Sequence, residues 1–188
     1  MLRQSISAIL LVSCFSPTGR AELPSPGKPE VAAPACGESG RLTTELFGGI
    51  QGSLDWQAGD LACEGMPRPD DEGARLKLSG PYKSGDSVTT LTFILGLPDL
   101  EAGQTGDELP TNVTLMEEGS GRFFGTPDAD GCWTDVTEQK PADSGEENEF
   151  LITGSLYCVS PLAELNGGSS VNFTELNFTG RVTWVPAK

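Results

Sequence analysis

Apolar and polar residues alternate along most of this chain. From Leu42 to Trp56 the even positions are mainly apolar and the odd positions mainly polar, with Phe47 as the exception. A period of two is that of a β-strand with one buried face. Two consecutive glycines interrupt the run, but a two-residue hairpin loop there would place Leu46 opposite Gln51 and break the apolar face. The pattern therefore predicts one bent or bulged strand over the whole run.

Similar alternation predicts further strands, which are separated by stretches rich in Gly, Pro, Asp and Ser. One helical turn is predicted over 160–167, because Ser and Pro stand at its start and Gly at its end. The predicted strands after the first span 75–79, 88–97, 113–116, 122–124, 133–137, 150–159 and 171–184.

Many short strands and almost no helical pattern indicate antiparallel sheets. The sequence predicts an all-β domain over 35–188, a single antiparallel β-sandwich of jelly-roll or immunoglobulin-like scale with one short helical turn and two disulfides. Segments 44–56 and 174–184 resemble each other, since both open on Thr-Glu-Leu and close on Trp. This similarity predicts two strands in equivalent settings that are neighbours in one sheet.

The N-terminal residues have the layout of a signal peptide. One arginine is followed by a short apolar run over 6–12 and by small residues before Ala21. Cleavage after Ala21 would make 1–21 the signal peptide. Segment 22–34, which contains four prolines, is predicted to be a linker. The expected location is extracytoplasmic, either periplasmic or secreted.

A second interpretation of the same region concerns Cys14. The run from Leu11 to Cys14 resembles the lipobox of bacterial lipoproteins, in which the cysteine carries the lipid. Lipidation would remove 1–13 and make the protein an outer-membrane lipoprotein, held at the membrane only through that lipid. The two interpretations remain open at this point.

Removal of the N-terminal segment leaves four cysteines, an even number that suits an oxidising compartment. Four cysteines allow three pairings. Cys132 and Cys158 lie symmetrically about Gly145, so antiparallel pairing of the strands on either side would bring them face to face. We therefore expect Cys132–Cys158, and Cys36–Cys63 follows by elimination. Each disulfide closes a loop worth about 3 kcal/mol in chain entropy.

The chain is strongly acidic, with 27 acidic and 12 basic residues and a formal net charge of −15. Such a field repels phosphate backbones and anionic headgroups, which argues against nucleic acid as a partner. Cationic partners or calcium are favoured, although abundant acids also serve solubility alone. The expected partner is a protein or a glycan.

The chain contains no histidine, which excludes Ser-His-Asp and Cys-His catalysis and histidine metal sites. Carboxylates could still hydrolyse glycosides if one acts as an acid and the other stays ionised. The candidates are Asp128, Asp130 and Asp135 with Glu117 or Glu118. Carboxylates are so frequent here that chance pairs are common, so the sequence favours a protein that is not an enzyme.

Residues Asp128 to Gly131 resemble the opening of a calcium loop, with Asp135 as a further candidate ligand. The EF-hand pattern then fails at positions 132, 133 and 139. No cofactor is expected beyond calcium at a site of another kind. An Asp-Gly turn between strands is the competing interpretation.

Three tryptophans could bind sugars. Trp56 and Trp184 fall on the apolar faces of their strands, where packing in the core is expected. Trp133 stands beside a cysteine and a turn and is the candidate ligand-binding residue. The sequence thus favours an exported, non-catalytic binding or envelope-structural protein. A carboxylate-dependent glycoside hydrolase and a calcium-stabilised adhesive module are the alternatives.

Overall fold

The computed structural model describes residues 36–69, 72–127, 131–144 and 146–184. The predicted signal peptide 1–21, the linker 22–34 and the lipidation candidate Cys14 lie outside the described residues. Two candidate metal ligands, Asp128 and Asp130, lie outside them as well.

The described part of the chain contains thirteen strands, and every pairing between them is antiparallel. The prediction of an all-β, antiparallel fold is confirmed. In chain order the strands are β1 (Arg41–Gly48), β2 (Gly52–Gln57), β3 (Ala62–Pro67), β4 (Ala74–Ser84), β5 (Ser87–Leu97), β6 (Gly106–Pro110), β7 (Asn112–Glu117), β8 (Arg122–Gly125), β9 (Cys132–Pro141), β10 (Glu149–Cys158), β11 (Leu162–Glu164), β12 (Ser170–Phe173) and β13 (Leu176–Thr183).

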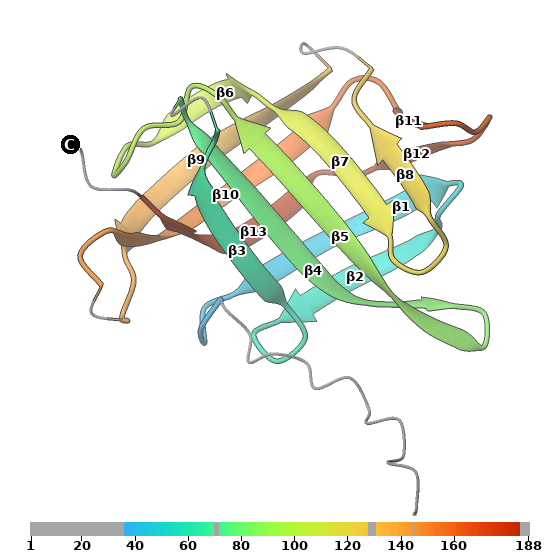
Figure 1. Cartoon of the computed structure of the whole chain (residues 1–188), viewed down its shortest axis with the longest axis horizontal. Helices are drawn as coiled ribbons and strands as arrows, with labels where there is room; N and C mark the ends of the chain where they lie inside the picture. Colours follow the sequence, from blue (N-terminus) through green and yellow to red (C-terminus); the bar gives the residue numbers. More distant parts are fainter. Residues whose placement is uncertain (1–35, 70–71, 128–130, 145, 185–188) are drawn as a thin grey trace, which may run out of the picture. The chain divides into compact units, whose positions relative to one another are not determined.

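Hydrogen bonds join these strands into one continuous sheet with two halves. One half has the order β3-β4-β5-β7-β8-β11-β12, and the other has the order β1-β13-β10-β9-β6 with β2 added beside β1. In Figure 1, β3, β4 and β5 cross in front of β13, and contacts join β13 to both β3 and β4. The two halves therefore face each other across the core.

Side chains from both halves fill this core. Phe93 on β5 packs edge-on against Trp56 on β2 and against Phe173 on β12, with ring centroids 6.3 and 6.2 Å apart. Leu76, Leu91 and the other alternating leucines of β4 and β5 are fully buried, as the period-two pattern predicts. Burial of these apolar side chains is the main favourable contribution to folding.

The prediction of one bent strand over 42–56 is wrong. The segment forms a hairpin in which Leu42 pairs with Trp56 and Leu46 with Gly52. In this register even-numbered residues of β1 lie opposite even-numbered residues of β2. The loop around Ile50 is longer than a two-residue turn, and it therefore leaves the apolar side chains of both strands on one face. The predicted strand 171–184 likewise divides into β12 and β13. Its expected proximity to the first strand is confirmed, because Leu42 also pairs with Phe178 on β13.

The predicted helical turn over 160–167 is wrong, and no helix occurs among the described residues. Leu162 instead pairs with Val171 and is fully buried, while Ala163 pairs with Gly125 on β8. Strand partners on both sides satisfy backbone groups that one isolated helical turn would leave open. Strands β3 and β6 were not predicted either, because neither alternates clearly.

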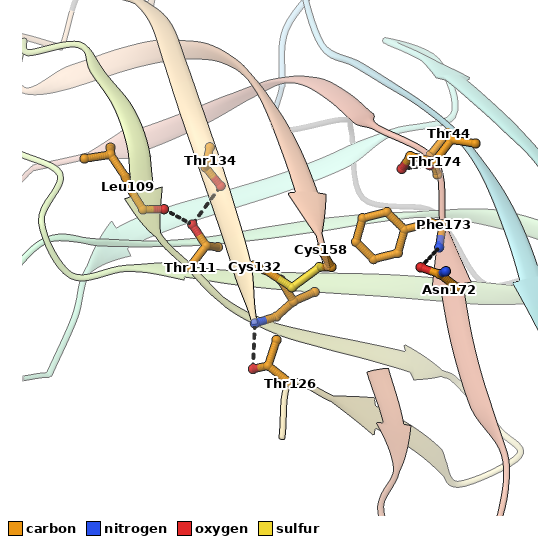
Figure 2. Close-up of a disulfide and its surroundings, with 11 residues drawn as sticks. Thr44, Leu109, Thr111, Thr126, Cys132, Thr134, Cys158, Asn172, Phe173 and Thr174 are labelled. Carbon is orange, nitrogen blue, oxygen red and sulfur yellow. Dashed lines mark hydrogen bonds between the residues drawn. A yellow bond between two sulfur atoms is a disulfide. The ribbon is translucent and has the colours of Figure 1, made fainter. Parts of the chain in front are cut away.

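Both predicted disulfides are present, Cys36–Cys63 and Cys132–Cys158. Cys132 and Cys158 are direct cross-strand partners on β9 and β10, as the symmetry of the sequence predicts. Figure 2 shows this disulfide near the buried hydroxyl of Thr111, whose oxygen lies 2.8 Å from Thr134 Oγ1. Two disulfides are typical of proteins that fold in an oxidising compartment.

Among the residues that the structure describes, no helix has the length and apolar character needed to cross a membrane.

Candidate binding face

The outer surface of β1, β13, β10 and β9 carries polar side chains. Even-numbered residues of β1, β13 and β10, and of β9 as far as Val136, point into the core, as Leu42, Phe178 and Leu156 do; beyond Val136 a register shift places Glu138 opposite Thr153. Successive side chains of a strand point to opposite faces, so their odd-numbered neighbours form the outer surface. We call this surface the polar face.

Strand register sorts the polar face into rows that run across the strands. In the central row, Thr43 pairs with Asn177, Asn177 pairs with Ser155, and Ser155 pairs with Asp135. In the adjacent row, Arg41 pairs with Thr179 and Thr179 with Thr153. Because partners on neighbouring strands are about 5 Å apart, each row presents one polar side chain per strand at a regular interval.

A groove of about 640 Å³ follows these two rows. Its lining includes Arg41, Thr43, Thr153, Ser155, Asn177 and Thr179. Hydroxyl and amide groups that both donate and accept hydrogen bonds therefore dominate its floor.

The central row differs from its neighbour in how its side chains are bonded. Thr153 Oγ1 and Thr179 Oγ1 are 3.1 Å apart and bond each other. The side chains of Thr43, Asn177 and Ser155, by contrast, make no hydrogen bond to any residue in the described ranges. The groove thus contains a row of polar groups without partners from the described protein.

Two aromatic side chains lie next along β9 and β10. Trp133 and Tyr157 are direct cross-strand partners, with ring centroids 5.8 Å apart and planes inclined by 28°. Both rings are half-buried on the polar face, one register step beyond the Cys132–Cys158 disulfide. Alternation places the disulfide on the core side and the rings on the outer side, so the crosslink fixes the strands that carry the stack.

Two carboxylates accompany the aromatic stack. Asp135 on β9 accepts a hydrogen bond from the backbone N–H of Glu108 at 2.7 Å. Glu108, on β6, has φ 51° and so adopts the left-handed conformation, which costs a residue with a side chain about 1–2 kcal/mol. The register of β6 against β9 also shifts between Gly106 and Leu109. The irregular edge strand therefore carries a strained residue beside the stack.

Burial raises the pKa of the Tyr157 phenol above its ordinary value of 10.0. The negative charges of Glu108 and Asp135, and a hydrogen bond with the Glu108 side chain, raise this pKa further. The phenol is protonated at neutral pH already at the ordinary pKa of 10.0, and the raised pKa extends this protonated range to higher pH. Tyr157 can therefore donate a hydrogen bond, but it is a poor nucleophile.

Of the candidate carboxylate pairs, the structure separates Asp135 from Glu117 and Glu118, whereas the pairs with Asp128 or Asp130 lie outside the described residues. Glu117 on β7 pairs with Arg122 at 3.5 Å, and Glu118 accepts a hydrogen bond from Thr92 at 2.8 Å. Strands β5 and β7 belong to the half of the sheet that does not carry Asp135. The partner that the structure does bring to Asp135 is Glu108, which the sequence analysis did not select.

Trp56 lies in the core and donates to Pro81 O at 2.9 Å, as its apolar strand face predicts. Trp184 is only partly buried and donates to Gln139 Oε1 at 3.3 Å. Trp133 is the tryptophan on the polar face. Its partner Tyr157 could have been found from the same alternation on 150–159, whereas nothing local to Glu108 indicates that it reaches the site.

No group of three or more metal-ligating side chains is close enough to hold an ion among the described residues. Calcium binding through Asp128 and Asp130 remains a prediction, because these residues are not described. Comparisons of the chain with protein-family models, with curated proteins and with solved structures found no match.

Proposed function

We propose that this protein is an exported, non-catalytic binding protein whose polar face holds a glycan. The Trp133–Tyr157 stack beside the groove is the observation that carries this proposal. Aromatic rings pack against the apolar C–H faces of sugars, while their polar ends and nearby polar groups bond the hydroxyls. The unpartnered row of Thr43, Asn177 and Ser155 supplies such groups.

Export is supported by the two disulfides and by the N-terminal segment. The crosslinks need an oxidising compartment, which the periplasm or the cell exterior provides. Processing after Ala21 would release the protein, whereas lipidation of Cys14 would anchor it at the outer membrane. Intact-mass analysis of exported protein separates these two forms, because only one of them carries an acyl mass.

The non-catalytic assignment is supported by the chemistry around Tyr157. Hydrogen bonds engage the Glu108 side chain with Tyr157 and the Asp135 carboxylate with the backbone N–H of Glu108. The second candidate is a carboxylate-dependent glycoside hydrolase, which the proximity of Glu108 and Asp135 to one tyrosine favours. Turnover of a glycan that is lost in Asp135→Asn would establish the hydrolase and overturn the binding assignment.

A glycan array probed with the purified full chain tests the proposal. We expect retention of neutral glycans and a loss of at least about tenfold in affinity for Trp133→Ala. Phe123→Ala is the matched control, since Phe123 is an exposed ring on β8 in the other half of the sheet. An array that retains nothing contradicts the proposal, and so do two variants that bind equally well.

A further inference from the structure

We infer, resting on the proposed function, that the preferred glycan carries free amino groups and that the aromatic stack binds them in their protonated form. The charges around the stack support this inference. Asp135 and Glu108 border the stack on the side of β6, and Glu175 borders it on the side of β13. The stack therefore has negative charge on both of its sides.

Asp135 and Glu108 are held together beside Tyr157. Asp135 Oδ1 accepts the backbone N–H of Glu108 at 2.7 Å, and the Glu108 side chain bonds the Tyr157 phenol. Two carboxylates in one place repel each other, and a cation beside them relieves that repulsion. This end of the polar face therefore favours a positively charged ligand group.

Glu175 lies on the other side of the stack. It immediately precedes β13, whose first residue, Leu176, pairs with Leu156 on β10. Tyr157 follows Leu156, so Glu175 and Tyr157 occupy the next pair of positions of these antiparallel strands, and both lie on the polar face. Glu175 also lines the groove. The groove and the stack therefore share this carboxylate.

The protein supplies no counter-charge to these three carboxylates. None of them forms an ion pair with a lysine or arginine in the described ranges, whereas Glu138 on β9 pairs with Lys140 at 3.2 Å. Arg41 is the cation that lines the groove. It lies two strands across and four residues along from Tyr157, about 10 Å and about 14 Å. These distances exceed the Debye length of about 8 Å at physiological ionic strength, so Arg41 does not neutralise the stack.

A protonated amino sugar matches both parts of this site. An ammonium group is attracted to the face of a tryptophan or tyrosine ring, and its N–H groups donate to carboxylates. A single exposed ion pair contributes little affinity. Selection here follows because a ring and neighbouring carboxylates act on the same ammonium group. An acidic sugar would instead meet like charges.

Calorimetric titration of the full chain with glucosamine oligomers, and with N-acetylglucosamine oligomers of the same length, tests this inference. Acetylation removes the charge and keeps the sugar ring. In mildly acidic, low-salt buffer we expect the free amine series to bind about tenfold or more tightly. This advantage should shrink in high salt, because salt screens charges. An advantage that high salt leaves unchanged overturns the inference.

Two further outcomes separate the inference from the proposed function. Equal affinity for the two series, lost in Trp133→Ala, overturns the inference alone and leaves the proposed function standing. A glycan array that retains nothing overturns both. Lysine oligomers of matched charge are the competitor in the same titration. If they bind as tightly as the amino sugar, the site recognises positive charge alone and the inference falls.

Two variants with the same change in net charge locate the amine. Glu108→Gln should reduce the tenfold advantage of the free amine series to about threefold or less. Glu138→Gln is the matched control, because Glu138 lies on the polar face but already pairs with Lys140. Circular dichroism and thermal unfolding establish that both variants fold. Equal effects of the two substitutions would show that only overall charge matters and would overturn the inference.

Discussion

Trp133 and Tyr157 stack as direct cross-strand partners, one register step from the disulfide between Cys132 and Cys158. The two neighbouring pairs lie on opposite faces of the same two strands. The disulfide therefore holds β9 and β10 at the separation and register that keep the rings in contact. In this way a covalent bond on the core side positions the aromatic stack on the polar face.

Removal of that disulfide should affect stability and binding together. Cys132→Ala with Cys158→Ala is expected to lower the free energy of unfolding by about 3 kcal/mol, because the bond closes a loop of 26 residues. Glycan affinity should fall as well, since the strands under the stack gain freedom. Urea unfolding and calorimetric titration measure the two effects.

The other disulfide provides the control for this experiment. Cys36→Ala with Cys63→Ala opens a loop of 27 residues and should cost a similar free energy. The Cys36–Cys63 disulfide ties β3 to the start of the described chain. Because neither cysteine lies on the strands that carry the stack, glycan affinity should persist. Equal losses of affinity in both double variants would contradict the positioning role of Cys132–Cys158.

Glu108→Gly should make the protein more stable. Glycine adopts the left-handed conformation without strain, but it gains entropy in the unfolded chain, so we expect a net stabilisation of about 0.5–1 kcal/mol. Asn166→Gly is the control: Asn166 also has a positive φ, at 64°, but asparagine tolerates that region. Urea unfolding of both variants measures the difference, and equal shifts would argue against strain at Glu108.

The pH dependence of Tyr157 follows from its raised pKa. Below pH 10 the phenol is protonated in the folded and the unfolded chain, and its contribution to stability is complete. As the pH rises above 10 the unfolded chain loses this proton first, so stability falls until the folded pKa is passed. Tyr157→Phe should lack this part of the alkaline loss of stability.

The same pKa can be measured by tyrosinate absorbance. The difference between the titrations of the wild-type protein and Tyr157→Phe isolates one of the two tyrosines in the chain. Glu108→Gln removes a negative charge beside the phenol and should lower the midpoint of that difference titration. A midpoint that Glu108→Gln leaves in place would contradict the hydrogen bond between the two side chains.

Gly65→Ala should disrupt the crossing of β3 over β13. A Cβ atom at this position would overlap the backbone carbonyl of Arg181 and lie 2.6 Å from Val182 Cγ2. Backbone atoms cannot move aside at low cost, so we expect a loss of about 2–3 kcal/mol in thermal or urea unfolding. Gly59→Ala, which meets no atom within 4 Å, should change stability by less than about 0.5 kcal/mol.

Much of the fold was predictable because burial on one face of a strand imposes a period of two. That period identified the buried side of β4 and β5, and the symmetry of Cys132 and Cys158 identified their pairing. The hairpin of β1 and β2 was missed since a hairpin with even positions opposite even ones has the same alternation as one long strand. The helical turn was predicted wrongly because capping residues indicate only a local preference, whereas Leu162 is buried in the core as part of a strand.

Part of the candidate site could likewise be predicted from the sequence, and part could not. Alternation on a single strand is enough to place Trp133 and Asp135 on an outer face, because Cys132 and Val136 at the alternate positions are apolar, and the structure shows both buried. Only the tertiary structure brings Glu108 to them, through an irregular edge strand, and aligns Asn177 with Ser155 and Thr43. Local sequence pattern determines which side of a strand is buried, but partners more than a hundred residues apart are decided by long-range pairing, which no local period encodes.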